Sequence, residues 1–200
     1  RWDVKNKRPA KRRIGAIIMA AGQGTRMRCS SVHKVCFPLC GKPVINRIIE
    51  TLYGCGIDSH FLVIKHLAEQ VMNTVSSAPG THYFCYQKEA RGTGNAAKAA
   101  AEIIKTIPQI DDVLVIAGDK IIEESILKKL AERFYETDSD LAFIAGGIRD
   151  FRNAGRIVYK NGRVAGIVEA FDIALPGMLA ELEKHISGKA LSPAKAEKII

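Results

Sequence analysis

The sequence predicts an α/β domain in which a largely parallel sheet is covered by helices on both faces. Short apolar runs alternate with segments of helical periodicity along much of the chain, and this alternation is typical of parallel strands joined by helices. A chain of 200 residues is also long enough to bury the core of one such domain.

Five apolar runs are expected to form the strands, because each is short and is bounded by polar or turn-forming residues. They are "IGAIIMA" (14–20), "FLVIK" (61–65), "HYFCY" (82–86), "DVLVIA" (112–117) and "DLAFIAG" (140–146). Four intervening segments carry an apolar stripe at helical spacing; they are residues 43–54, 67–75, 94–104 and 124–135.

The later part of the chain departs from this alternation. The segments "GRIVYK" and "RVAGIVE" are joined by Asn161-Gly162, a dipeptide that favours the tight turn of a β-hairpin. Residues 173–200 predict two helices, the second of which begins at Ser192 and Pro193, a residue pair that suits a helix start.

The positive charge is concentrated at the start of the chain. The net charge is +9, and residues 1–13 contain seven Lys or Arg against one Asp, which leaves only +3 for the rest. A short basic tail can contact phosphates or acidic membranes, but aromatic residues, at 6%, are too sparse for a base-stacking surface. No apolar run reaches the ~18–20 residues of a membrane span, so we expect neither a nucleic acid nor a membrane as partner.

Five cysteines are present, and none forms a C-x-x-C pair. An odd number without that spacing favours reduced thiols over a disulfide framework or a zinc site. The start of the chain also lacks the features of a secretory signal, so we expect a cytoplasmic protein. Because the chain begins at Arg1, we expect it to be part of a longer, multidomain chain.

The first apolar run leads directly into "AAGQGTRM", residues 20–27. Glycines let a backbone turn sharply and approach a ligand without Cβ atoms, and the amides of such a loop can surround phosphate oxygens. Arg26 adds a planar cation that suits phosphate. Ligands of open α/β sheets bind outside the carboxyl ends of the strands, so the loop predicts a phosphate site. It lacks the third glycine of the dinucleotide fingerprint and the Gly-Lys-Ser/Thr of a P-loop.

Five motifs occur in a specific order: "AAGQGTRM", "HKVCFPLCGKPVI", "YQKEARGTGNAAKAA", "VIAGDK" and "GRIVYKNGRVAGIVE". In order and rough spacing they resemble the sugar-phosphate nucleotidyltransferases, and most closely the uridyltransferase domain of N-acetylglucosamine-1-phosphate uridyltransferases. The resemblance covers residues 14–172. It implies a Rossmann-like three-layer sandwich with a mostly parallel sheet, of the nucleotide-diphospho-sugar transferase type. Residues 1–13 are then a basic tail or linker, and residues 14–200 a nucleotidyltransferase domain that is incomplete at its C-terminal end.

The resemblance also implies roles for individual positions. In that family the first loop surrounds a nucleoside triphosphate, UTP being the expected one here, and the matching residues are Ala20, Ala21, Gly22, Gly24, Thr25 and Arg26. Lys34 matches a catalytic lysine that follows the loop, and Asp119 the aspartate that holds Mg²⁺. The uracil-reading positions match Gln87, Gly92 and Thr93, and the sugar-binding positions match Gly155 and Glu169.

The expected reaction is attack of a sugar-1-phosphate oxygen on the α-phosphorus of the triphosphate, which releases pyrophosphate. Charge then spreads over the non-bridging oxygens, and Arg26, Lys34 and a metal on Asp119 are the kinds of group that stabilise it. Magnesium binds with few carboxylates when phosphate oxygens complete its shell. Taken alone, Lys34, Gln87 and Glu169 also fit ordinary surface positions.

Departures from the family pattern leave alternatives open. His33 stands where the family usually has proline, one extra residue separates Arg26 from Lys34, and "AGDKII" differs from the family on both sides of its Gly-Asp pair. No Asp or Asn follows Asp172, whereas the family takes an asparagine for the sugar and a second metal ligand from later in the domain. The chain is therefore expected to turn over poorly alone. The alternative is a nucleotide- or sugar-phosphate-binding regulatory module without activity, and hexosamine, hexose and choline phosphates remain possible acceptors.

Overall fold

The computed structural model describes residues 12–24, 27, 31–89, 92–137, 139–146, 156–160 and 163–168. The chain divides into two compact units, Arg1–Phe143 and Ile144–Ile200. No helix within the described ranges combines the length and apolar character that crossing a membrane requires.

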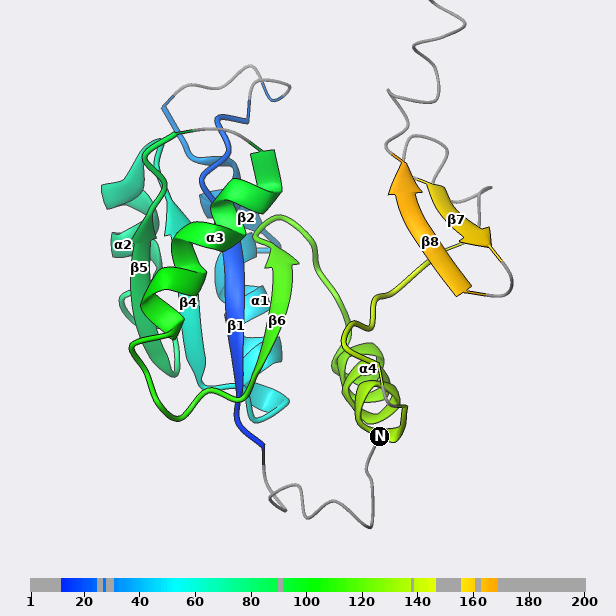
Figure 1. Ribbon diagram of the computed structural model, residues 1–200. Helices are drawn as coiled ribbons and strands as arrows, with labels where there is room; N and C mark the ends of the chain where they lie inside the picture. Colours follow the sequence, from blue (N-terminus) through cyan, green and yellow to red (C-terminus); the bar gives the residue numbers. More distant parts are fainter. Residues whose placement is uncertain are drawn as a thin grey trace, which may run out of the picture. The chain divides into compact units, whose positions relative to one another are not determined.

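The first unit is built on a parallel sheet of four strands in the order β5-β4-β1-β6, which Figure 1 shows in face view. The strands are β1 (Ile14–Ala20), β4 (Ser59–Ile64), β5 (Thr81–Tyr86) and β6 (Asp112–Ala117). Two of them have the bounds that the sequence predicts, and the other two begin one or two residues earlier. Since β4 is buried at every position, its continuous apolar run is typical of a strand covered on both faces.

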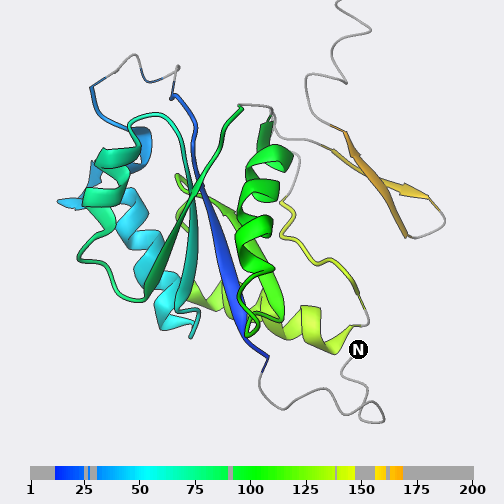
Figure 2. The ribbon, with the colours of Figure 1, turned by 60° about the vertical axis from the view of Figure 1, so that its left-hand side comes forward.

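Helices cover both faces of this sheet. α1 (Val44–Gly54) and α2 (Ala68–Val75) lie against one face and α3 (Gly92–Ile104) against the other, as Figure 2 shows with the sheet seen between them. α4 (Glu124–Glu136) packs beside α1 and buries Leu127. The predicted α/β sandwich with a mostly parallel sheet is confirmed.

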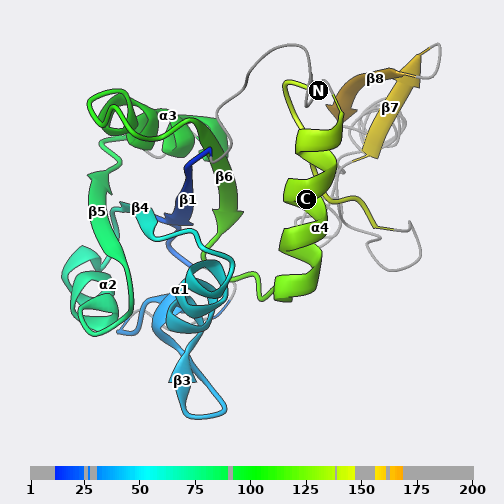
Figure 3. The same cartoon turned by 90° about the horizontal axis from the view of Figure 1, so that it is seen from below.

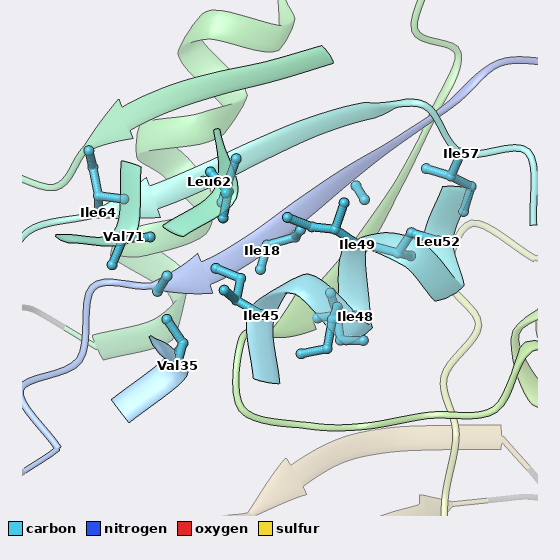
Figure 4. Packing of buried hydrophobic residues seen from close by; sticks show 14 of the residues in the cluster. Ile18, Val35, Ile45, Ile48, Ile49, Leu52, Ile57, Leu62, Ile64 and Val71 are labelled. Carbon is cyan, nitrogen blue, oxygen red and sulfur yellow. The ribbon is translucent and has the colours of Figure 1, made fainter. Parts of the chain in front are cut away.

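The alternating side chains of β1 contribute to two separate cores. Ala16, Ile18 and Ala20 pack with α1 and α2, whereas Ile17 packs with α3. Figure 4 shows the larger core, in which Ile45, Ile48 and other α1 side chains lie over β1 and β4. Burial of a side chain the size of Ile17 or Ile18 contributes roughly 1.5–3 kcal/mol to the free energy of folding. The alternating residues of β1 therefore hold both helical layers to the sheet.

The connections between the strands reverse direction at β1. The chain runs from β1 through α1 to β4 and through α2 to β5, and then returns through α3, on the opposite face, to β6 on the other side of β1. Figure 3, viewed from below, shows α3 on one side of the sheet and α1 on the other. Open α/β sheets bind ligands at the carboxyl ends of the strands where such a reversal occurs. The crevice expected here lies between β1 and β6.

Small elements follow the first strand. A short 3₁₀ helix, η2 (Lys34–Cys36), precedes an antiparallel pair, β2 (Pro38–Leu39) and β3 (Lys42–Pro43). In the second unit, β7 (Arg156–Lys160) and β8 (Arg163–Val168) form the predicted antiparallel hairpin. Its turn at 161–162 and the helices predicted in 173–200 lie outside the described residues.

The strand predicted for residues 140–146 is wrong. The structure gives no strand there, and Leu141 is 72% exposed and Ile144 52% exposed. A strand forms only with a hydrogen-bonding partner, because its backbone groups have none of their own. Among the described strands none pairs with this segment, so its apolar composition alone does not order it.

Candidate functional site

The loop that follows β1 begins at the carboxyl end of the sheet. Ala20 is fully buried and Ala21 packs against the α3-side core, so the loop starts from a rigid base. Gly24 has a φ of +64°, a left-handed conformation that glycine adopts without strain. Thr25 and Arg26, the remaining predicted residues of this loop, lie outside the described residues.

The glycines of this loop leave space for the side chain of Lys34. A Cβ atom added to Gly22 would lie 3.3 Å from Lys34 Cε, and one added to Gly24 would lie 3.3 Å from Lys34 Cβ. Both distances are tighter than ordinary van der Waals contact. The lysine stem therefore runs along the loop, and the absence of side chains at both positions allows that path.

Lys34 contacts Asp119, which follows β6. Its Nζ donates to Asp119 Oδ2 at 2.9 Å, and the two side chains are 26% and 39% exposed. Partial burial raises the pKa of the Asp119 carboxyl, but the hydrogen bond and charge of Lys34, together with Lys120, outweigh it and hold the pKa below its usual value. Asp119 is accordingly an ionised carboxylate at neutral pH.

Gly118 fixes the direction in which the chain leaves β6. Its N–H donates to the Met19 carbonyl at 2.9 Å. A Cβ atom at this position would lie 3.0 Å from that carbonyl oxygen and 3.2 Å from Cγ1 of Val35 in η2. A side chain here would require the Met19 backbone or Val35 to shift, so glycine lets the ends of β1, β6 and η2 lie close together beside Asp119.

His33 is the buried residue on which η2 begins. Its side chain is 1% exposed, and its Nδ1 accepts from the Val35 N–H at 3.3 Å. The backbone N–H of His33 donates to Oε1 of Gln70 on α2, and Gln70 Nε2 donates to the Ser31 carbonyl. The segment before Lys34 is thus tied to α2 as well as to its own helix.

The end of β5 places Gln87 beside the first turn of α3. Gln87 is 4% exposed, and its Nε2 donates to Asn95 Oδ1 at 3.0 Å and to the Gly92 carbonyl at 3.4 Å. Gly92 has a φ of +84°, and Thr93, which follows it, is exposed. The structure therefore brings Gln87 and Gly92 together, with Thr93 next to them, while the Gln87 amide nitrogen serves the start of α3.

The remaining predicted site residues lie in the second unit. Gly155 and Glu169 fall outside the described residues, as does any contact they make. For a metal, the contact between Lys34 and Asp119 offers one carboxylate, and no group of three or more His, Cys, Asp or Glu side chains gathers anywhere in the described part of the chain. A single carboxylate fits Mg²⁺ when phosphate oxygens and water supply the other ligands.

Some polar residues of this edge are missed by sequence reasoning. Gln70 and Asn95 hold the segments that carry Lys34 and Gln87, and Lys65 Nζ donates to the Lys88 carbonyl at 2.9 Å beside Gln87. Gln70 and Lys65 make their contacts 39 and 23 positions away, and Asn95 lies eight positions after Gln87. An isolated polar residue in the sequence carries no signal of such a contact.

Comparisons with known proteins agree with this architecture. The Bifunctional protein GlmU of Pseudoalteromonas atlantica is 35% identical over 160 residues, which cover 80% of this chain and 34% of that protein. HddC from Yersinia pseudotuberculosis, solved with GMP-PN, superposes with a TM-score of 0.58 at 25% identity, covering 78% of this chain and 68% of that one. A UDP-glucose pyrophosphorylase from Acinetobacter baumanii gives a TM-score of 0.60 at 17% identity, covering 79% and 68%.

The fold is that of the Rossmann-like nucleotidyltransferases. The family described as the MobA-like NTP transferase domain matches residues 16–183, and the chain belongs to this family. The chain spans about a third of the length of the curated relatives that it matches.

Proposed function

We propose that this chain binds a nucleoside triphosphate and transfers its nucleoside monophosphate to a sugar-1-phosphate. The observation that carries the proposal is the path of Lys34, which crosses the glycine loop and meets Asp119 at the point where the sheet connections reverse. A cation and a carboxylate at this place suit a triphosphate and its metal. UTP and N-acetylglucosamine-1-phosphate are the proposed substrates, since the sequence resembles uridyltransferases and its relatives include GlmU proteins.

In the proposed reaction, an oxygen of the sugar-1-phosphate attacks the α-phosphorus of UTP. The bond from that phosphorus to the bridging oxygen of the β-phosphate breaks, and pyrophosphate leaves with the bonding electrons. Lys34 stabilises the charge on the non-bridging oxygens, a role that Arg26 shares. Ala20, Ala21, Gly22 and Gly24, with Thr25, surround the nucleotide in this proposal, and the two glycines let the backbone come close to it. Gln87, Gly92 and Thr93 contact the base in this proposal, and Gly155 and Glu169 the sugar.

Magnesium fits the residues that are present if it arrives with the triphosphate. Asp119 would hold it, and an ionised carboxylate with few protein neighbours is the kind of ligand that leaves room for phosphate and water. When bound, the ion neutralises phosphate charge. Lys34 and Asp119 pair with one another in this structure, so both have to change partners when the nucleotide enters.

A second candidate is a module that binds nucleotide or sugar phosphate without turnover. The sequence favours it through one observation: residues 173–200 contain no Asp or Asn that could serve as a second metal ligand. The transferase predicts that UTP with Mg²⁺ raises the melting temperature and that pyrophosphate is released. The binding module predicts a rise with UTP or with a sugar phosphate, and no release of pyrophosphate.

The test is pyrophosphate release from UTP, Mg²⁺ and N-acetylglucosamine-1-phosphate, with Asp119→Asn as the variant. Asp119→Asn is expected to lower the rate about 10²–10³-fold, as does the loss of other preorganised charged groups. Its melting temperature should stay unchanged, because Asp119 is partly exposed. Asp140→Asn, at an exposed position after α4, is the matched control and keeps full activity.

Three outcomes separate the candidates. Turnover in the wild type that Asp119→Asn abolishes supports the transferase. UTP binding without turnover, either in this chain or in one extended through the following sequence, supports the binding module. A wild-type chain whose melting temperature is shifted by neither a nucleoside triphosphate nor a sugar phosphate contradicts both.

A further inference from the structure

Gln70 of α2 holds the backbone of the segment that leads into Lys34. Its Oε1 accepts from the His33 backbone N–H, and its Nε2 donates to the Ser31 carbonyl at 3.3 Å. A backbone N–H can only donate and a carbonyl oxygen can only accept, so these partners fix which end of the Gln70 amide carries the oxygen. One half-buried side chain thus binds the backbone at two places, one and three positions before Lys34.

The helix that carries Gln70 is itself fixed to the core. Val71, the next residue, is fully buried in the larger core, and so is Val75 one turn later. Close-packed side chains of this kind leave a helix little freedom to move. The two hydrogen bonds of Gln70 therefore tie the backbone before Lys34 to a rigid element.

On the other side of Lys34, the core holds the chain directly. Val35 is fully buried in the same cluster as Val71. The residue before Lys34 is thus fixed through its backbone, and the residue after it through its side chain. Between them the Lys34 stem runs along the glycine loop, and its Nζ meets Asp119. A lysine side chain has many rotamers, so a defined path for it depends on a fixed backbone.

We propose that Gln70 is a positioning residue that keeps Lys34 in place for the phosphates of the nucleotide by holding the backbone at Ser31 and His33. Gln70 touches no substrate itself and acts only through the lysine. A cation that is already in place binds phosphate without first being ordered, so loss of the Gln70 contacts weakens nucleotide binding. The inference rests on the proposed function, since it assigns Gln70 to the same nucleotide site.

Three substitutions test this role. Gln70→Met removes both hydrogen bonds but keeps the length of the side chain and the helical propensity of the position. Lys34→Ala removes the group through which Gln70 acts. Asn46→Leu is the matched control: Asn46 Nδ2 donates to the Thr74 carbonyl of α2 at 3.0 Å, so this variant also removes a contact between a side chain and the backbone at α2, but it leaves residues 31–34 unchanged.

The first measurement is a cycle of UTP affinities in the presence of Mg²⁺, at a temperature where every variant is folded. Gln70→Met is expected to lower the affinity about fivefold, and Lys34→Ala about tenfold or more. The double variant should bind no more weakly than Lys34→Ala alone, because no lysine is left to position. Asn46→Leu keeps the wild-type affinity. Losses that multiply in the double variant, or a wild-type affinity in Gln70→Met, overturn the proposal.

The second measurement needs no nucleotide. Acetylation by a trace of reagent, followed by mass spectrometry, measures how readily the Lys34 amine reacts in the free protein. Gln70→Met is expected to raise this rate about twofold to fivefold, toward the rate in Asp119→Asn, as for the loss of a partly exposed ion pair. Lys128, which pairs with Glu124 at 3.0 Å, is the internal reference, and its rate stays the same. An unchanged Lys34 rate in Gln70→Met overturns the proposal.

The inference and the proposed function fail in different ways. A wild-type chain that binds no nucleoside triphosphate contradicts the proposed transferase, and the acetylation rate of Lys34 alone then decides whether Gln70 places the lysine. A wild-type chain that binds UTP while Gln70→Met leaves both the affinity and the Lys34 rate unchanged keeps the proposed function and overturns the role of Gln70.

Discussion

Two buried histidines lie near opposite ends of the parallel strands, which we call the amino edge and the carboxyl edge of the sheet. Their rings differ in hydrogen bonding. At the amino edge, His60 is fully buried, its Nε2 contacts the Ile57 carbonyl at 2.9 Å and its Nδ1 contacts His82 Nδ1 at 3.3 Å. At the carboxyl edge, His33 is equally buried, but only Nδ1 has a partner of full hydrogen-bond geometry in the described part of the chain.

The charged groups of the two edges also differ in the number of contacts that they make. At the amino edge, Arg12 Nη2 donates to Asp112 Oδ1 and its Nε lies 2.7 Å from Oδ2, while Tyr135 donates to the same carboxylate. At the carboxyl edge, Lys34 and Asp119 meet through a single contact that a ligand can replace. Polar groups hold segments together at both edges, and the difference lies in the charged groups: Asp112 is bound by two side chains, whereas Lys34 and Asp119 share one contact.

Gly80→Ala is expected to give the largest effect on stability and tests the amino edge. Gly80 has a φ of +96°, and a Cβ atom there would lie 2.6 Å from the Asp58 carbonyl oxygen and 2.7 Å from Cε1 of His60. Backbone strain of this kind costs ~1–3 kcal/mol, and the clash with a carbonyl that bonds Thr81 adds overpacking of ~1–3 kcal/mol. Urea denaturation should show a total loss of about 3 kcal/mol or more.

The control for this prediction is Gly56→Ala at the same edge. Gly56 also has a positive φ, +80°, but nothing lies within 4 Å of the added Cβ. Its loss should stay near ~1 kcal/mol, the strain alone. Equal losses in the two variants would show that the close packing around Gly80 contributes nothing, and neither variant should change UTP affinity in the folded protein.

Lowering the pH is expected to destabilise the protein through His60. Burial lowers the pKa of His60 from 6.5 to about 4. The hydrogen bond to the Ile57 carbonyl and the charge of Asp58 raise this pKa, and the charge of His82 lowers it further. Between these two pKa values the unfolded chain binds a proton that the folded chain excludes. The free energy of unfolding is therefore highest above pH ~6.5 and falls by up to ~3 kcal/mol as the pH approaches ~4. Urea denaturation across this range measures the slope. His60→Gln should flatten it, and an unchanged slope in that variant would assign the effect to other groups.

Gly22→Ala is the smallest change and tests the carboxyl edge. The added Cβ meets only the flexible end of Lys34, at 3.3 Å from Cε and 3.5 Å from Nζ, so the side chain can move aside with little loss of stability. Displacing the lysine from its path should weaken UTP binding about fivefold to tenfold, or ~1 kcal/mol. Calorimetric titration and thermal melting measure the two quantities. A large drop in melting temperature with unchanged affinity would contradict this difference between the two edges.

Most of the sheet could be predicted from local sequence. The bounds of β1 and β6 follow from apolar runs. β1 begins after Arg13 and ends two residues before Gly22, and β6 begins after Asp111 and ends directly before Gly118. The antiparallel pairing of β7 with β8 agrees with the hairpin that the dipeptide Asn161-Gly162 predicts. The segment 140–146 shows where this reasoning fails, since an apolar run becomes a strand only if a neighbour supplies hydrogen bonds.

The sequence by itself determined the four strands of the parallel sheet, the helical faces and the glycine loop, because each depends on residues close together along the chain. The order of five motifs along the chain indicated the family. Tertiary structure alone decided that Lys34 meets Asp119, 85 positions later, and that the Gln87 amide is directed to Asn95. It also decided that His33 is buried beside the glycine loop and His60 beneath the opposite edge. Such contacts depend on which strands become neighbours. Burial then sets the pKa of each side chain and decides which of its hydrogen-bonding atoms have partners, and no local sequence pattern contains this information.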